Sequence, residues 1–114
     1  MSYTVEDGFA KMIQIEGLPK PERQFRIYPL TALLSKPPRK VMPWRWDFAW
    51  PLNRLVLDVQ GGLFTGGGHV RGLQYEKDCR KHCHAVLQGY RVLTVSSGMV
   101  RSHEAIRILR EALK

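Results

Sequence analysis

The sequence is poor in cysteine, in acidic residues and in long apolar stretches. Its two cysteines, Cys79 and Cys83, are too few for a disulfide-stapled scaffold. No stretch approaches the ~18 consecutive apolar residues of a membrane span, and the first residues lack the basic start and apolar run of a signal peptide. We therefore expect a cytoplasmic protein without membrane contact, and the 114 residues fit one domain, 1–114.

The shortage of acids leaves a strong positive charge. The chain has 18 Lys and Arg against 10 Asp and Glu, which gives a net charge of +8. The net charge is −2 over residues 1–16, +6 over residues 17–57 and +4 over the rest. A basic excess of this kind predicts a polyanionic partner, most often nucleic acid and less often an acidic membrane or protein.

Hydrophobic periodicity and turn residues predict the order of the elements. Thr4 is a helix cap, and the helix after it ends at Gly17. Strands are expected over residues 24–28, 44–51, 54–60 and 90–95, and helices over 73–88 and 104–113, with a glycine-rich loop over 61–72. The first three strands can form a meander, and the helical crossover lets the last strand pair in parallel. The predicted fold class is an α/β sandwich with a mixed four-stranded sheet.

Side-chain spacing predicts which faces are buried. On the helix over 73–88, we expect one stripe in the core and one cationic face in solvent. The buried stripe would hold Cys79, Cys83, Val86 and Leu87, and the cationic face Lys77, Arg80, Lys81 and His84. This places the cysteines in the core and not in a zinc cluster. In the aromatic strand, strict alternation would put Trp44, Trp46 and Trp50 on one face and Asp47 on the other.

Two aspartates interrupt the apolar strands, Asp47 in WRWDFAW and Asp58 in LVLDVQ. A carboxylate inside a strand is costly to bury unless something pairs with it. A divalent cation is one partner, because Mg²⁺ binds a few carboxylates together with water and substrate phosphate. Glu6, at the edge of the first helix, is a candidate third acid. The alternative is that Asp47 and Asp58 form ordinary salt bridges with arginines, for which the candidates are Arg26, Arg45 and Arg54.

These acids and the order of the elements resemble the PD-(D/E)xK nuclease superfamily. Asp47 matches the first acid, and Asp58-Val59-Gln60 matches the second motif, with Gln60 where lysine is usual. Further stretches look like a small phage-type branch related to very-short-patch mismatch repair endonucleases. They are residues 17–26, 44–51, 61–62, 69–72, 77–78 and 89–93. The resemblance implies a restriction-endonuclease-like αβββαβα sandwich and, for a phage protein, action in the host cytoplasm.

The resemblance also implies an activity and the residues that carry it. It implies a Mg²⁺- or Mn²⁺-dependent endodeoxyribonuclease that hydrolyses phosphodiester bonds, with nicked, mismatched or branched DNA as candidate substrates. Glu6, Asp47 and Asp58 would hold the metal. Because Gln60 is uncharged, either Gln60 itself, a lysine from the following helix (Lys77) or His69 would assist the attacking water. His69 also fits a solvated loop position.

Basic residues on both sides of the aspartates would hold the DNA backbone. They are Lys36, Arg39, Lys40, Arg71, Lys77, Arg80, Lys81 and His84. One chain holds one site, so a homodimer would supply the second site for double-strand cleavage. The alternatives are a non-catalytic DNA-binding module that lost cleavage through Gln60 and, less favoured, an RNA-binding protein.

Overall fold

The structure of the protein, a computed structural model, describes residues 4–29, 43–60 and 68–114, with the backbone alone for residues 68–71. The elements follow one another as α1 (Val5–Ile15), β1 (Glu22–Ile27), β2 (Trp44–Trp50), a short 3₁₀ turn η1 (Pro51–Asn53), β3 (Leu55–Gln60), α3 (Gly68–Leu87), β4 (Arg91–Ser96), α4 (Ser97–Arg101) and α5 (Glu104–Ala112). The predicted order is confirmed. Helix α4 is an addition that the sequence did not indicate.

The four described strands form one mixed sheet in the order β1-β2-β3-β4. Strand β2 pairs antiparallel with both β1 and β3, whereas β3 and β4 are parallel. The predicted meander and the parallel crossover through α3 are therefore confirmed. Strand β3 is central and buried on both faces from Leu55 to Asp58, which agrees with its nearly continuous apolar sequence.

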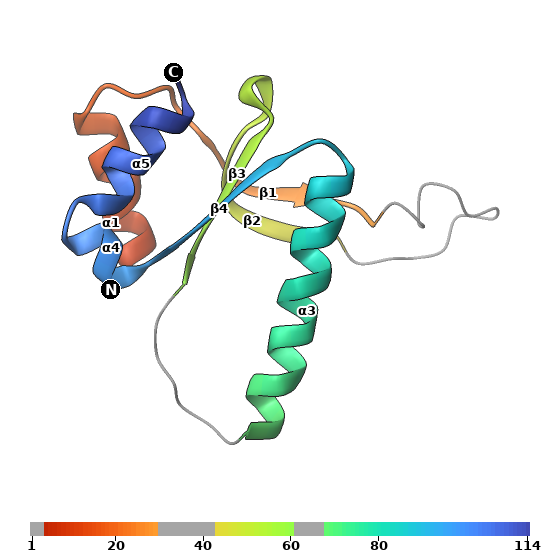
Figure 1. The fold of residues 1–114 in the computed structure, drawn as a ribbon. Helices are drawn as coiled ribbons and strands as arrows, with labels where there is room; N and C mark the ends of the chain where they lie inside the picture. Colours follow the sequence, from red (N-terminus) through yellow and green to blue (C-terminus); the bar gives the residue numbers. More distant parts are fainter. Residues whose placement is uncertain (1–3, 30–42, 61–67) are drawn as a thin grey trace.

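Helices cover both faces of the sheet (Figure 1). Helices α1, α4 and α5 cover one face, and their contact with the sheet forms the α1 cluster, whose buried members are Phe9, Ile13, Phe48, Trp50, Leu55, Leu57, Val95, Val100, Ala105, Ile106 and Leu109. Helix α3 covers the other face and contributes to a smaller α3 cluster of Ile27, Trp46, Ala49, Val56 and Ala85. The larger core lies on the α1 side.

Helix α1 forms where the capping signal places it. The Thr4 hydroxyl accepts a hydrogen bond from the Asp7 amide at 3.0 Å, which satisfies a free N–H of the first turn. Phe9 and Ile13 lie one turn apart and are buried against the sheet. Gly17, with φ of +69°, ends the helix in the left-handed conformation that suits glycine. The helix therefore presents Glu6, at its first turn, towards the sheet from a fixed position.

The predictions for α3 need two corrections. The helix begins at Gly68, so His69 and Arg71 lie in its first turns and not in a loop that continues to Gly72. Adding turns to an existing helix is easy once it has nucleated, even through glycine. The predicted core stripe is also wrong, because Cys79, Cys83, Val86 and Leu87 are exposed. The side towards the sheet instead carries Lys81, His84 and Ala85, because β2 and β3 supply partners for the two polar side chains.

The aromatic strand also departs from strict alternation. Trp44 stacks on His84 of α3 and Trp46 belongs to the α3 cluster, but Trp50 lies in the α1 cluster beside Phe48. The single face predicted for the three indoles is therefore wrong. Trp46 and Phe48 should share a face in a regular strand but lie on opposite faces of the sheet. The change occurs at Asp47, where hydrogen bonds to aspartate side chains replace the backbone pairing of β2 with β3.

We predict that the central strand dominates stability. Leu57 is fully buried in β3, whereas Leu52 in the η1 turn is fully exposed. Leu57→Ala should lower the free energy of unfolding by about 3 kcal/mol, because it removes buried apolar surface and leaves a cavity. Leu52→Ala is the matched control and should change it by less than about 0.5 kcal/mol. Urea unfolding of both variants measures the difference, and equal losses would contradict the buried position of Leu57.

Candidate functional site

Asp47 and Asp58 meet where the β2–β3 ladder stops. Backbone pairing runs from Trp50 opposite Leu55 to Phe48 opposite Leu57, and the two aspartates occupy the next position. There, hydrogen bonds to the two aspartate side chains replace the backbone hydrogen bonds between β2 and β3. The Asp47 amide donates to Asp58 Oδ1 at 2.9 Å, and the Val59 amide donates to Asp47 Oδ2 at 2.8 Å. Each carboxylate is thus held against the backbone of the other strand.

The aspartates belong to a polar row that crosses the whole sheet. Counting along the register from the paired residues, Gln24 of β1 stands opposite Asp47, and Thr94 of β4 is the partner of Asp58. Gln24 has φ of +54°, in the left-handed region that non-glycine residues seldom occupy. Such strain costs of order 1 kcal/mol and is often found at functional sites. The irregular backbone of both β1 and β2 lies at this row.

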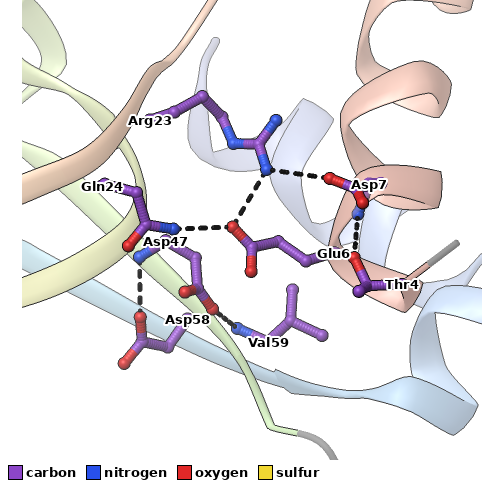
Figure 2. A network of polar contacts seen from close by, with 8 residues as sticks. All are labelled: Thr4, Glu6, Asp7, Arg23, Gln24, Asp47, Asp58 and Val59. Carbon is purple, nitrogen blue, oxygen red and sulfur yellow. Dashed lines mark hydrogen bonds and ion pairs between the residues drawn. The ribbon is translucent and has the colours of Figure 1, made fainter. Parts of the chain in front are cut away.

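Glu6 reaches the same row from α1 (Figure 2). Its Oε1 accepts from the Gln24 amide at 2.9 Å and pairs with Arg23 Nη2 at 3.0 Å, and Arg23 also contacts Asp7 at 3.4 Å. The charge of Glu6 acts on Asp47. Glu6 therefore lies near enough to Asp47 to act on its charge, but two other side chains already hold it, and the three predicted acids form no ready metal-binding group among the described residues.

Lys81 approaches the aspartates from α3. Its ammonium forms an ion pair with Asp58 Oδ2, and the two side chains are only 14% and 13% exposed. The same ammonium lies 4.2 Å from the centre of the Trp46 ring, close enough for a cation–π contact. Trp46 is itself buried, so the lysine is held between an aromatic ring and a carboxylate. This arrangement places a positive charge directly beside the carboxylate pair.

A pocket of about 500 Å³ opens beside this ion pair, between α3 and the sheet. Asp58, Gln60 and Thr94 line it from β3 and β4, and Tyr75 and Lys81 line it from α3. Gln60, in the position where the resemblance expects lysine, therefore shares a pocket with the lysine that α3 supplies. The pocket gives a substrate access to one side of Asp58.

The environment of Asp47 disfavours its charged form. The pKa of Asp47 is raised to about 6, first by partial burial and then by the negative charges of Asp58 and Glu6, while the Val59 amide and Lys81 act in the opposite direction. Like charges held close together raise a carboxyl pKa in this way because each disfavours ionisation of the other. A nearby cation would relieve this repulsion.

The donor set suits a hard cation. Among the described residues, no group of three or more His, Cys, Asp or Glu side chains is arranged to hold a metal ion. Mg²⁺, however, is usually held by one or two carboxylates, with water and substrate phosphates completing its coordination. Asp47 and Asp58 provide two neighbouring carboxylates, and the pKa of Asp47 is raised mainly by burial and in part by the charge of Asp58. Two carboxylates are within the number that Mg²⁺ uses in proteins, and Glu6 is a further acid whose charge reaches Asp47.

The basic residues predicted to assist cleavage or to hold DNA fall into three groups: exposed on α3, turned towards the sheet, or outside the described residues. Lys77 and Arg80 are exposed on α3, and Arg80 pairs with Glu76 at 3.4 Å. The outward cationic face predicted for α3 is therefore wrong for Lys81 and His84, which turn towards the sheet. The segment with Lys36, Arg39 and Lys40 lies outside the described residues, as do the side chains of His69 and Arg71.

Salt bridges to arginine do not explain the two aspartates. Within the described ranges, the ion pairs of Asp47 and Asp58 include no arginine, and Arg54 donates instead to the Gln88 carbonyl. Sequence reasoning missed the site contacts of Arg23, Gln24 and Trp46 and assigned Lys81 to the DNA backbone. The helical spacing could have indicated Lys81, because it lies one turn after Lys77 on the same face of α3 and was an equal candidate for the lysine supplied by this helix.

Comparisons with models of known protein families, with curated proteins and with solved structures found no match for this chain. In the part of the chain that the structure describes, no helix combines the length and the apolar character needed to cross a membrane.

The raised pKa of Asp47 predicts a pH-dependent effect of Asp47→Asn on stability without metal. The carboxyl titrates near its usual 3.8 when unfolded and at about 6 when folded. Its ionisation therefore destabilises the fold progressively between these values, and stability is lost as the pH rises through about 6. Because the group is half-exposed, screening reduces the effect to about 1 kcal/mol.

The measurement is chemical unfolding of both proteins in EDTA from pH 3.5 to 8. Asp47→Asn should gain about 1 kcal/mol over the wild type above pH 6 and nothing below pH 4, since asparagine can still accept the Val59 hydrogen bond. A difference that does not vary with pH would contradict the raised pKa.

The Lys81–Asp58 pair predicts a strong coupling in stability. Lys81→Met should lower the free energy of unfolding by about 2 kcal/mol, because it leaves a nearly buried carboxylate without its counter-charge. Adding Asp58→Asn to Lys81→Met should recover most of the loss. Lys77→Met, one turn earlier and exposed, should change stability by less than about 0.5 kcal/mol. Thermal unfolding of five proteins tests this, namely the wild type, Lys81→Met, Asp58→Asn, the double variant and the Lys77→Met control, and additive losses would exclude the coupling.

Proposed function

We propose that the protein is a metal-dependent DNA endonuclease. The observation that carries the proposal is the meeting of Asp47 and Asp58 at the end of the β2–β3 ladder, with the Lys81 ammonium beside them. Two fixed carboxylates with a nearby cation, in a chain of net charge +8, suit a phosphodiester substrate better than a structural salt bridge. The resemblance to PD-(D/E)xK nucleases supports the same reading.

Asp47 and Asp58 would hold a Mg²⁺ or Mn²⁺ ion, with Glu6 as the third candidate. A bound ion of this type activates water and offsets the charge that develops on the phosphoryl group. The protein's own part is positional. The Val59 amide fixes the Asp47 carboxylate, and the Asp47 amide fixes Asp58, so neither acid needs to reorganise when substrate arrives.

Lys81 is the residue that we assign to the role of the missing strand lysine. Its ammonium is held at Asp58 by the ion pair and by the Trp46 ring, at the wall of the pocket. There it can stabilise negative charge on a phosphodiester oxygen or orient the attacking water. Gln60 lines the same pocket and offers an amide donor and a carbonyl acceptor. Lys77 is exposed one helical turn before Lys81, and we assign to it a contact with the DNA backbone.

The proposal is tested by cleavage assays on supercoiled, nicked, mismatched and branched DNA with Mg²⁺ or Mn²⁺. Asp47→Asn and Asp58→Asn should each reduce the rate at saturating DNA by at least a hundredfold, and Lys81→Met should do so by a similar factor. Lys77→Met should raise KM, less so at high salt because one phosphate contact is lost, and leave kcat nearly unchanged. Glu111→Gln, an exposed acid on α5, is the control for loss of one carboxylate.

The outcome that would refute catalysis is equally specific. If the wild type binds all four DNA forms but cuts none with either metal, the chain is a DNA-binding module that retains the fold without the reaction. If Asp47→Asn and Glu111→Gln cut at the same rate as the wild type, the aspartate pair is not the site.

A further inference from the structure

Two arginines stand directly opposite each other on the first two strands. Arg26 of β1 and Arg45 of β2 are partners in the antiparallel register, and both are exposed. Their neighbours Ile27 and Trp46 belong to the α3 cluster and Trp44 stacks on α3. Since side chains alternate along a strand, both arginines project from the opposite face, on the side of α1. Partners of this kind have Cβ atoms about 5 Å apart.

No acid of the protein neutralises this pair. All 10 acidic residues lie in the described parts of the chain. The ion pairs among those parts engage Arg23, Arg80 and Arg110, but neither Arg26 nor Arg45. The contrast with Arg23 is informative, because it lies on the same strand and contacts both Glu6 and Asp7. The two acids in the first turn of α1 are thus paired with Arg23 and not with Arg26.

Like charges opposite each other destabilise a sheet, so the fold gains nothing from this pair. Two guanidinium groups side by side present a set of N–H donors that matches the oxygens of a phosphate. Arg45 lies two residues from Asp47, which is about 7 Å along the strand. An anion bound between the two arginines would therefore lie on the α1 side of the sheet, close enough to the row of Asp47 to belong to the same strand of substrate.

We propose that Arg26 and Arg45 form a clamp for a phosphate of the DNA strand being cut. This inference deepens the proposed function and rests on DNA as the substrate. The clamp adds a binding site on the α1 side of the row, separate from the pocket that Gln60 and Lys81 line. It fixes the register of the backbone and carries no sequence preference, as phosphate contacts in general do. The segment that joins the two strands contains Lys36, Arg39 and Lys40 and no acid, which favours the same ligand.

The test is DNA binding by fluorescence anisotropy in EDTA, where no cleavage can occur. Arg26→Gln/Arg45→Gln should bind a duplex roughly tenfold more weakly than the wild type at 100 mM salt and reduce the slope of log affinity against log salt by nearly two. Arg101→Gln/Arg107→Gln removes the same charge from exposed positions on α4 and α5 and should change affinity less than about threefold. A duplex RNA of the same sequence is the second probe.

A stability measurement accompanies the binding assay. Because the repulsion is relieved, Arg26→Gln alone should raise Tm by about 3 °C in the absence of DNA. A purely structural role for the pair predicts the opposite sign. If the two double variants bind alike, if Tm falls, or if RNA binds as tightly as DNA, the DNA clamp is wrong. If no DNA is cut by the wild type but the Arg26→Gln/Arg45→Gln variant alone loses binding, the clamp stands and the nuclease activity fails.

Discussion

The site depends on two carboxylates that take the place of backbone hydrogen bonds. Strands β2 and β3 pair through their backbones as far as Phe48 and Leu57, and beyond that point each aspartate accepts a hydrogen bond from a backbone amide of the other strand, Asp47 from Val59 and Asp58 from Asp47. Only an acceptor side chain can do this, so the same residues that close the sheet also concentrate negative charge. Removing either acid would disturb pairing and chemistry together, which makes isosteric asparagine the informative replacement.

The side chains around the two aspartates offset part of the negative charge of the site. Lys81 compensates Asp58 and is held by the Trp46 ring, while Arg23 and Gln24 hold Glu6. Asp47 alone has no cationic partner among the described ion pairs, and its pKa is raised to about 6. The protein thus tolerates a cluster of acids by pairing two of them with cationic or amide groups and disfavouring ionisation of the third. A divalent cation would remove the remaining repulsion.

The sequence was sufficient for the strands and for the two aspartates, because apolar runs closed by glycine or proline and isolated acids within them are local signals. It was insufficient wherever a partner distant in sequence decides the outcome. Lys81 and His84 face inward because Asp58 and Trp44 receive them, so the apolar stripe of α3 was assigned to the wrong side and Lys77 was preferred over Lys81. The left-handed backbone at Gln24 and the burial of Trp50 on the α1 side accompany the interruption of strand pairing at Asp47. Local sequence patterns do not predict such an interruption.

The most direct measurement is an anomalous difference map from crystals grown with Mn²⁺ and a short DNA duplex. We predict a peak bonded to carboxylate oxygens of both Asp47 and Asp58, with the Lys81 ammonium moved from Asp58 towards a phosphate. A map without a peak at the two aspartates, in which Lys81 remains paired with Asp58 while DNA is bound elsewhere, would contradict the metal site and with it the assignment of the protein as a nuclease.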